Sequence, residues 1–318
     1  MKFTINKKLL SNSMQKGFAV CTRGIRSEFK DAAKITIKAD KGKVLFMSTN
    51  GYLDIITTIN DVVVDEEGIA TLNVGPATKI ANAIGRDNDD IEVLLKLTGG
   101  VSPHVCFKNK NRSMNAKMET EASDLKFTIS KPKDGFEHVF PCKTFCQSVN
   151  DLSKYKSPYK YRLRYLMMCL HFLPDYTRFI CGCGMRFGVL EHKNKNTITD
   201  LEDAKLGDKK LLPAEQASII ASIIEGEDDI LMKWKENKNC YIESGNSKLY
   251  LKGIPEEEYI NYEIHAFRYE DAVAVVDIPR EDLADLSNLV GATRDQESES
   301  EGEFLTCHLK FQSNGLLT

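Results

Sequence analysis

The sequence lacks both a long apolar run and an export signal. Its 318 residues nowhere hold the roughly 18 consecutive apolar residues of a membrane-spanning helix. The start, Met-Lys-Phe-Thr-Ile-Asn-Lys-Lys, alternates as a strand does and has no apolar signal core. The sequence therefore predicts no membrane association, and we expect a protein of the cytoplasm.

The short motifs that mark common active sites are also missing. The sequence contains no phosphate-binding glycine loop, no Gly-x-Ser-x-Gly and no paired carboxylates beside a histidine. We therefore predict no catalytic residue and no cofactor, and we favour a binding protein over an enzyme.

The nine cysteines are odd in number and irregularly spaced, which argues against a disulfide framework and for reduced, buried thiols. Cys142, Cys146, Cys181 and Cys183 raise the question of a metal site. However, Cys142 and Cys146 fall on the apolar face of an expected helix, and no CxxC or HxxxH pair accompanies them. We predict no metal, and an enzyme with a Cys-x-Cys redox or metal centre is the third alternative.

Basic residues are not in surplus. The sequence has 43 Lys and Arg against 46 Asp and Glu, for a formal net charge of −3. This balance argues against a positively charged coat but leaves room for a local basic channel. With 42% hydrophobic and 28% charged residues, the composition is typical of a globular protein, and the length suggests two or three domains.

What the sequence does contain is internal repetition. The stretch 178–190 places Gly182 and Gly184 between two strand-like runs, and glycine permits backbone angles and close approaches that other residues do not. The stretch 43–57 has the same order of strand, polar pair, glycine and strand. Its Gly51 lies 133 residues before Gly184.

Further correspondences have similar offsets: the strand 3–5 and helix 8–19 match the strand 138–140 and helix 143–154, and Pro76 matches Pro213, 137 residues later. A third front half consists of a strand at 272–278, a helix from Pro279 to 290 and a strand at 305–311. The sequence thus predicts three αβ units of about 130 residues. The third lacks roughly 85 residues of a full copy, as in a fragment or a shortened protein.

Three expected helices bury an apolar stripe and expose basic and polar residues. The expected buried residues are Leu10, Met14 and Phe18; Ala77, Ile80, Ala81 and Ile84; and Phe145, Cys146, Val149 and Leu152. The expected outward residues are Lys8, Asn12, Gln15 and Lys16; Lys79, Asn82 and Arg86; and Lys143, Gln147, Asn150 and Lys154, with Arg23 and Arg26 after the first helix. Because we expect no carboxylate on these faces, they suit sequence-independent contact with phosphates.

Two other expected helices differ, since their outward residues are neutral or acidic: Glu215, Ser218, Ser222 and Glu225 in one, and Glu281, Asp282 and Asp285 in the other. For any single helix, an ordinary solvated surface is the simpler interpretation.

The order of elements, the unit length and the glycine stretch resemble the beta sliding clamp of bacterial DNA polymerase III. The start, Met1 to Ile5 with Leu9 and Leu10, resembles the first strand and helix of that family. The stretch 181–188 resembles the family's Ala-Thr-Asp-Gly-His-Arg-Leu-Ala and keeps its Gly-x-Arg core. The stretch 259–262 resembles Phe-Pro-Asp-Tyr of the second linker.

This resemblance implies an α+β DNA-clamp fold of tandem repeated αβ domains, with helices lining a central hole and antiparallel sheets outside. The expected domains are clamp domain I at 1–137, clamp domain II at 138–262 and the first half of clamp domain III at 263–318. Two chains would close head to tail into a homodimeric ring around double-stranded DNA, and no catalysis is required.

By the same resemblance, the protein would be a processivity factor of DNA replication. Its partners would be DNA of any sequence, the replicative DNA polymerase, the clamp loader and a second copy of itself. The DNA-facing residues would be Arg23, Lys79, Asn82, Arg86, Lys143, Gln147, Asn150 and Lys154. The peptide-binding rim pocket would consist of Leu166, Gly182, Gly184, Met185, Arg186, Phe187, Ile260, Ile264 and His265.

The alternative is a clamp-fold module that binds polymerase or clamp-loader peptides but does not encircle DNA. The incomplete third unit and the acidic last helix favour it.

Overall fold

The computed structural model describes residues 1–24, 33–96, 102–109, 111–121, 125–156, 163–183, 186–199, 201, 207–236, 238–254, 259 and 262. For residues 165, 183, 186 and 187 it describes the backbone alone. The chain divides into two compact units, Met1–Ile260 and Asn261–Thr318, and nearly all described residues belong to the first unit. Arg26 and the expected third repeat at 263–318 lie outside the described residues.

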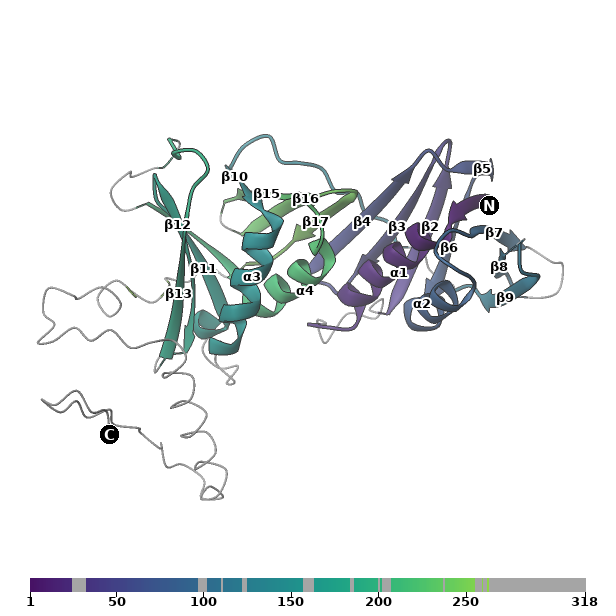
Figure 1. Cartoon of the computed structure of the whole chain (residues 1–318), viewed down its shortest axis with the longest axis horizontal. Coiled ribbons are helices and arrows are strands. Elements are labelled where there is room, and N and C mark those ends of the chain that lie inside the picture. Colours follow the sequence, from purple (N-terminus) through teal and green to yellow (C-terminus); the bar gives the residue numbers. More distant parts are fainter. Residues whose placement is uncertain are drawn as a thin grey trace, which may run out of the picture. The chain divides into compact units, whose positions relative to one another are not determined.

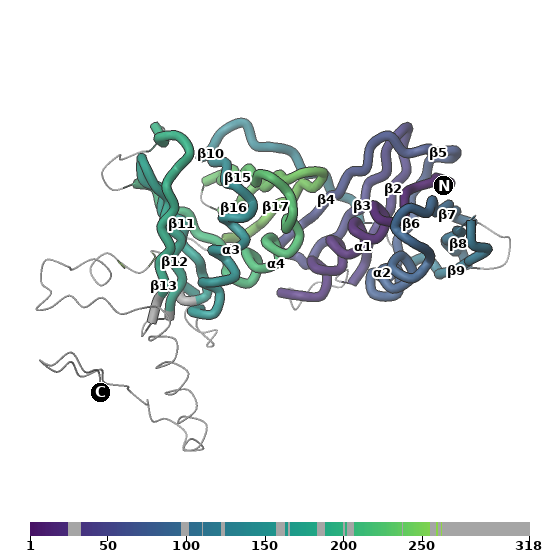
Figure 2. Tube along the Cα trace, in the orientation of Figure 1, coloured from purple at the N-terminus to yellow at the C-terminus, as the bar shows by residue number. Residues whose placement is uncertain are grey.

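The elements form two successive series, the first repeat in purple to blue and the second repeat in teal to green (Figures 1 and 2). The first repeat consists of β1 (Lys2–Asn6), α1 (Lys7–Cys21), β2 (Lys34–Asp40), β3 (Lys43–Thr49), β4 (Leu53–Asn60), β5 (Val63–Glu66), β6 (Gly68–Asn73), α2 (Val74–Ala83), β7 (Asp90–Lys96), β8 (His104–Asn109) and β9 (Met114–Glu119). The second consists of β10 (Phe136–Pro141), α3 (Cys142–Leu152), the short 3-10 helices η1 (Ser153–Tyr155) and η2 (Leu163–Leu166), β11 (Met167–Phe172), β12 (Tyr176–Cys183), β13 (Arg186–Lys193), β14 (Asp208–Pro213), α4 (Ala214–Ile224), β15 (Asp229–Lys235), β16 (Asn239–Ser244) and β17 (Ser247–Leu251).

The two repeats share one pattern of strand pairing. In the first repeat β1 pairs with β7, and β2 lies between β3 and β6; in the second, β10 pairs with β15, and β11 lies between β12 and β14. The register is also the same. Met47 of β3 faces Ile56 of β4, and 133 positions later Ile180 of β12 faces Val189 of β13. The offset that the two glycine stretches predict is therefore confirmed. The boundary between 137 and 138 stays a prediction, and β10 begins just before it.

Strands β4 and β17 join the two repeats. Residues Leu53 to Thr57 of β4 pair with Ser247 to Leu251 of β17 in an antiparallel ladder. This pairing makes one eight-stranded sheet in the order β10-β15-β16-β17-β4-β3-β2-β6. The other two sheets are β5-β1-β7-β8-β9 and β13-β12-β11-β14.

The helices pack as one row across the two repeats. Figure 1 shows α1 beside α2 and α3 beside α4, and α1 also packs against α4. Each helix pair buries most of its apolar stripe in the core of its own repeat, while Val20 of α1 belongs to the core of the second repeat. Leu10 and Ala81 belong to the first core, and Phe145 and Ala217 to the second. The outer faces of the four helices are therefore left for other contacts.

Helices α1 and α2 begin differently from α3 and α4. The side chains of Asn6 and Asn73 accept hydrogen bonds from the backbone N–H of the first turn, whereas Pro141 and Pro213 occupy the positions before α3 and α4. Asn73, not Pro76, is thus the counterpart of Pro213. The expected match of Pro76 is wrong because proline fits both the residue before a helix and its first turn.

The buried stripe of α1 differs from the expected one at Phe18, which is 41% exposed. Gly17 is buried in its place, and a Cβ atom there would lie 2.7 Å from both Ile35 Cδ1 and Ser48 Oγ. This close contact between helix and sheet turns the next residue outward. Periodicity alone favours a large apolar residue in the core and does not show where the backbone itself fills the space.

Asn50 holds the turn between β3 and β4, where Gly51 has a φ of 91°. Its buried side chain accepts hydrogen bonds from the N–H of Tyr52 at 3.0 Å and of Leu53 at 2.7 Å. It also donates to the carbonyl of Arg23 and to Gln216 Oε1, both at 3.1 Å. One amide therefore links the end of α1, the β3–β4 turn and α4 of the second repeat.

Asp89 ties the end of α2 to β8. Its Oδ2 accepts from the backbone N–H of Arg86 at 2.9 Å, from Asn109 Nδ2 at 2.8 Å and from Arg112 Nε at 2.7 Å. The Arg86 N–H, followed by Asn109 and Arg112, lowers the pKa of Asp89 to about 2. This carboxylate fixes the backbone that carries Arg86.

We expect Asn50→Ala to lower the free energy of unfolding by about 2 kcal/mol or more, because buried backbone groups lose their partners. Urea unfolding of the variant beside the wild type measures the change. Asn12→Ala, at an exposed position of α1, is the matched control and should change it little. Equal losses in the two variants would show that the Asn50 contacts contribute nothing specific.

Asp89 should make stability depend on pH in acid. Its pKa is lower in the folded chain than the ordinary value of 3.8, so its stabilisation is present above about pH 4 and is lost as the pH falls toward 2. Asp89→Asn should therefore be less stable at neutral pH, and its stability should change less with pH over this acidic range. Urea unfolding at several pH values tests this, and an unchanged slope for Asp89→Asn would contradict it.

Candidate nucleic-acid interface and peptide-binding rim

The eight expected DNA-facing residues are all exposed in the structure. Lys79 and Asn82 lie on α2; Lys143, Gln147 and Asn150 lie on α3; and Arg23, Arg86 and Lys154 follow the ends of α1, α2 and α3. Lys8, Asn12 and Gln15 of α1 are exposed as well, and Gln15 Nε2 donates to Asn82 Oδ1 at 3.1 Å. The structure thus brings the polar faces of α1 and α2 together.

Lys16 does not belong to this exposed set. Its side chain is 15% exposed and lies in the seam between the repeats, 3.4 Å from Glu227 Oε1. Its ammonium also donates to Asn246 Oδ1 at 3.1 Å and to Ser247 Oγ at 3.0 Å. The expectation that Lys16 faces outward is wrong, because the segment after α4 and the β16–β17 turn supply acceptors beside α1 that the helix pattern alone does not reveal.

The expected absence of carboxylates is also only partly right. Asp151 is exposed on α3, and Asp87, next to Arg86, lies 2.9 Å from Lys7 Nζ. Along α4, Glu215, Ser222 and Glu225 are exposed, as the sequence predicts. The row of helices therefore has basic and polar residues on α1, α2 and α3, with an acidic and neutral α4 between α1 and α3.

Part of the rim lies within the described residues. Gly182 is buried in β12 and pairs with Phe187 of β13, and Arg186 pairs with Cys183. Leu166 is half-buried at the end of η2, which packs against β12. The structure thus brings Leu166 and Gly182 to the same end of this sheet. The other expected rim residues, Gly184, Met185, Ile260, Ile264 and His265, lie outside the described residues.

Tyr259 lies against the rim strands and was not among the expected rim residues. Its hydroxyl donates toward the carbonyl oxygens of Met167 at 3.4 Å and Ile180 at 3.3 Å. Burial, with Cys169 and Cys181 nearby, raises the pKa of this hydroxyl, so it stays a neutral donor. The resemblance of 259–262 to a linker was the only available signal. It marked the segment but not the contact.

The described part of the chain offers no cluster of three or more His, Cys, Asp or Glu residues that could hold a metal ion. Cys142, Cys146 and Cys181 are reduced cysteines, and burial raises the pKa of Cys142 and Cys146. Among the same described residues, no helix is long and apolar enough to cross a membrane.

Comparison with known proteins gives a match in structure but not in sequence. No family model and no curated protein matches the sequence. Three similar solved structures are a putative DNA polymerase III beta subunit of Eubacterium rectale (TM-score 0.69, 15% identity), the beta subunit of Thermotoga maritima (0.67, 12%) and the sliding clamp of Pseudomonas aeruginosa bound to griselimycin (0.67, 13%).

Each similarity covers 83% of this chain and 66 or 67% of the other, so the chain spans about two thirds of the length of these subunits. At such low identity the similarity concerns the fold. The two repeats, each with two helices packed on antiparallel sheets, therefore have the DNA-clamp fold of bacterial DNA polymerase III beta subunits.

Proposed function

We propose that this chain is a sliding clamp that encircles duplex DNA and tethers a replicative DNA polymerase to it. The observation that carries the proposal is the row of helices on a clamp fold. Three of its four described helices turn lysine, asparagine and glutamine side chains away from the core. Such a surface binds the phosphate backbone without reading the bases.

The helix faces are suited to a mobile contact. The five cations of these faces each carry one exposed charge: Arg23, Lys79, Arg86, Lys143 and Lys154. Exposed charges of this kind give weak attractions that salt screens. A protein held this way has no preferred position along a duplex and slides, and the neutral and acidic α4 weakens the attraction further.

The tether would act without chemistry. Two copies would close head to tail into a ring, and the rim would bind a short peptide of the polymerase or of the clamp loader. Holding a polymerase near its template raises its effective concentration without a new contact between polymerase and DNA. The protein would work in the cytoplasm, with domains at 1–137, 138–262 and 263–318, and would need no cofactor.

The rim proposal depends on the glycine stretch. Glycine at 182 and 184 would let an extended peptide lie close to the backbone, while Leu166, Met185, Phe187 and Ile264 would supply apolar contacts. Arg186 would hold polar groups of the peptide, and Ile260 and His265 would complete the wall. The contact of Tyr259 with β11 and β12 supports this assignment, because it anchors the linker beside Gly182.

A second candidate, a clamp-fold module that binds such peptides without encircling DNA, is favoured by the acidic residues of α4 in the middle of the helix row. The two candidates differ in topology. A ring stays on closed circular DNA and is lost from the ends of linear DNA, whereas a module has no dependence on DNA ends.

For DNA, we expect the double variant Arg23→Glu and Arg86→Glu to be retained less on closed circular DNA, because two attractions become repulsions. Gel filtration of protein with circular DNA, before and after linearisation, measures retention. The wild type should be released by linearisation and should show no sequence preference. Retention of the wild type that is the same on circular and linear DNA would favour the module.

The matched control reverses two charges on the opposite face of the sheet. Ile35 and Ile37 of β2 belong to the core, so Lys38, between Ile37 and Ala39, points away from the helices, and Lys126 is exposed in the same surface groove. Lys38→Glu with Lys126→Glu should leave retention unchanged. If this control loses as much as the helix variant, net charge rather than the helix row governs binding.

At the rim, we expect Phe187→Ala to weaken binding of a fluorescent polymerase-tail peptide by a factor of about 5 to 150, the effect of removing one buried apolar anchor. Gly184→Val should crowd the peptide path and weaken binding as well. Both variants should keep wild-type retention on DNA. Equal peptide affinity in the wild type and both variants would place the peptide site elsewhere.

A further inference from the structure

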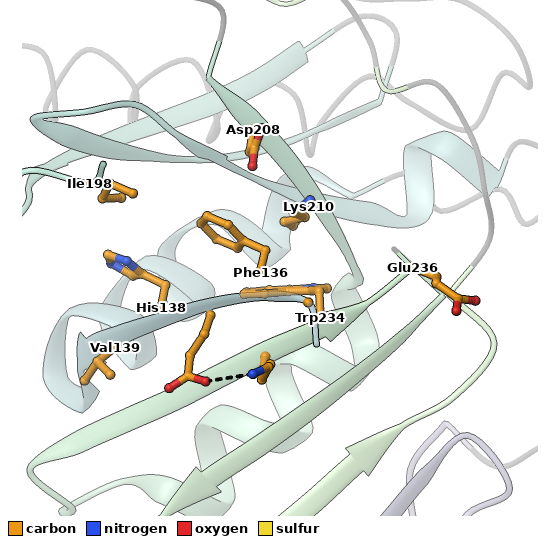
Figure 3. A pocket seen from close by; sticks show the side chains of 11 residues that line it. Phe136, His138, Val139, Ile198, Asp208, Lys210, Trp234 and Glu236 are labelled. Atoms are coloured by element: carbon orange, nitrogen blue, oxygen red, sulfur yellow. Dashed lines mark ion pairs between the residues drawn. The ribbon is translucent and has the colours of Figure 1, made fainter. Parts of the chain in front are cut away.

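The second repeat has a cavity of about 770 Å³ beside the outer edge of β10 (Figure 3). It is lined by Gly135 and the next four residues, together with side chains of β14 and β15 and Ile198. Successive side chains of a strand point to opposite faces. Because five consecutive residues border this cavity, it opens on the backbone edge of β10 as well as on a face.

The first repeat shows what fills the equivalent place. Phe3 faces Val93 there, and His138 faces Met232 in the second repeat, so positions in β1 and β10 differ by 135. In the first repeat β5 pairs with Lys2, Phe3 and Thr4 on the edge away from β7. The counterparts of these three residues are Glu137, His138 and Val139, and all three line the cavity. Among the described residues, β10 has a partner only in β15.

The opposite wall of the cavity, formed by β14, is also more open than its counterpart β6 in the first repeat. Gly68 and Ala70 of β6 face Ala39 and Ile37, and their counterparts in β14 are Asp208 and Lys210, which face Phe172 and Leu170. In the first repeat a Cβ atom on Gly68 would lie 2.8 Å from Met1 Cβ, so the wall there is closed. In the second repeat the same positions carry charged side chains that border open space.

Several polar groups of this cavity have no partner among the described residues. Trp234 is 1% exposed, and its indole Nε1 has no hydrogen-bond acceptor within the described part of the chain. Lys210 is 7% exposed, and its ammonium lies over the Phe136 ring, 5.2 Å from the ring centre. Asp208, also 7% exposed, borders the same cavity, and neither charge has an ion pair among the described residues. A buried indole N–H usually has a partner, and Asp208 and Lys210 add an acceptor and a donor beside it.

Two other charged residues of the wall, Glu137 and Lys233, pair with each other, and Glu236 is exposed beside them. Glu137 takes Lys131 at 2.8 Å and Lys233 at 3.3 Å, and Figure 3 shows the second of these ion pairs. Burial lowers the pKa of His138 to about 4, so its ring is neutral at physiological pH. Val139 is 49% exposed at the mouth, which is unusual for a large apolar residue in a strand. The cavity thus combines the open edge of β10, an exposed apolar residue at its mouth, Val139, and the donors of Trp234 and Lys210.

We propose that this groove binds an extended peptide segment of a partner protein, which adds as a strand to β10 in the way that β5 adds to β1. A polypeptide backbone has N–H groups, from which Asp208 can accept hydrogen bonds. It also has carbonyl groups, to which Trp234 and Lys210 can donate. This strand-addition groove shares no residue with the rim pocket, and it does not depend on DNA encirclement.

The chemistry of the segment follows from the groove and from its counterpart. Strand β5 belongs to the stretch Asp-Val-Val-Val-Asp-Glu-Glu at 61–67, in which valines precede acidic residues. In the register of β5, a valine of such a segment would lie opposite Val139, the counterpart of Thr4. Its acidic end would lie opposite Glu137, whose charge is balanced by Lys131 and Lys233. In strand addition, main-chain hydrogen bonds supply most of the affinity and such side chains supply the selectivity.

The test uses the tryptophan as a reporter, because Trp234 is the one tryptophan of the sequence. The probe is an acetylated, amidated peptide of residues 61–67, titrated into the full chain while Trp234 fluorescence and the indole N–H resonance are followed. We expect saturable changes in both. A peptide with Val64→Pro, which removes an N–H and disfavours a strand, should cause none.

Lys210→Ala introduces the residue of the first repeat, Ala70, and should weaken peptide binding about tenfold or more, the effect of losing a charged hydrogen bond. Lys209→Ala, at the exposed neighbouring position of β14, is the matched control and should bind as the wild type does. Val139→Asp changes an exposed residue and should weaken binding even if Lys210→Ala disturbs folding, which circular dichroism would reveal.

Three results would overturn the proposal. One is a Trp234 signal that does not change up to the solubility limit of the peptide, and another is equal affinity for the proline peptide. The third is self-association of the wild type that Val139→Asp abolishes, since a second copy of the chain would then occupy the groove. Failure of rim-peptide or DNA binding would not change the outcome of the groove titration. The strand-addition proposal and the sliding-clamp proposal therefore fail independently.

Discussion

The structure depends first on the antiparallel pairing of β4 with β17. Without this ladder the chain would be two separate αβ repeats, each with a helix pair and two sheets of its own. With it, the sheets fuse, and the contact of α1 with α4 turns two helix pairs into one row. The common helix surface depends on that alignment, including the side on which Arg23, Lys79 and Lys143 lie.

The sequence was informative where backbone geometry is restricted. The turn after β3 has a positive φ at Gly51, which favours glycine at that position. Strands β12 and β13 pair in the same register as β3 and β4, so the second repeat has its glycine, Gly184, 133 positions later in the sequence. The exposed positions of α2 and α3 also follow from the period of the helix, since their cores consist of ordinary side chains. These signals sufficed for the repeat, the two helix pairs and the outward basic residues of α2 and α3.

Where packing partners come from distant segments, the sequence did not suffice. Phe18 faces outward because Gly17 fits against Ile35, and Lys16 turns to Glu227 of the other repeat. Tyr259 reaches the carbonyls of β11 and β12, and the side chains of Asp208 and Lys210 border a cavity where their counterparts are small. In each case the position of the side chain is set by a residue of another element, so the local hydrophobic periodicity does not reveal it.

The fusion of the sheets also has a mechanical meaning. Two domains connected by a linker alone bend freely at the connection, but here bending would have to separate the residue pairs from Leu53–Leu251 to Thr57–Ser247 and pull Lys16 from its acceptors. Within the described residues, a bend between the two repeats therefore carries the cost of these hydrogen bonds, a cost that a linker alone would not impose.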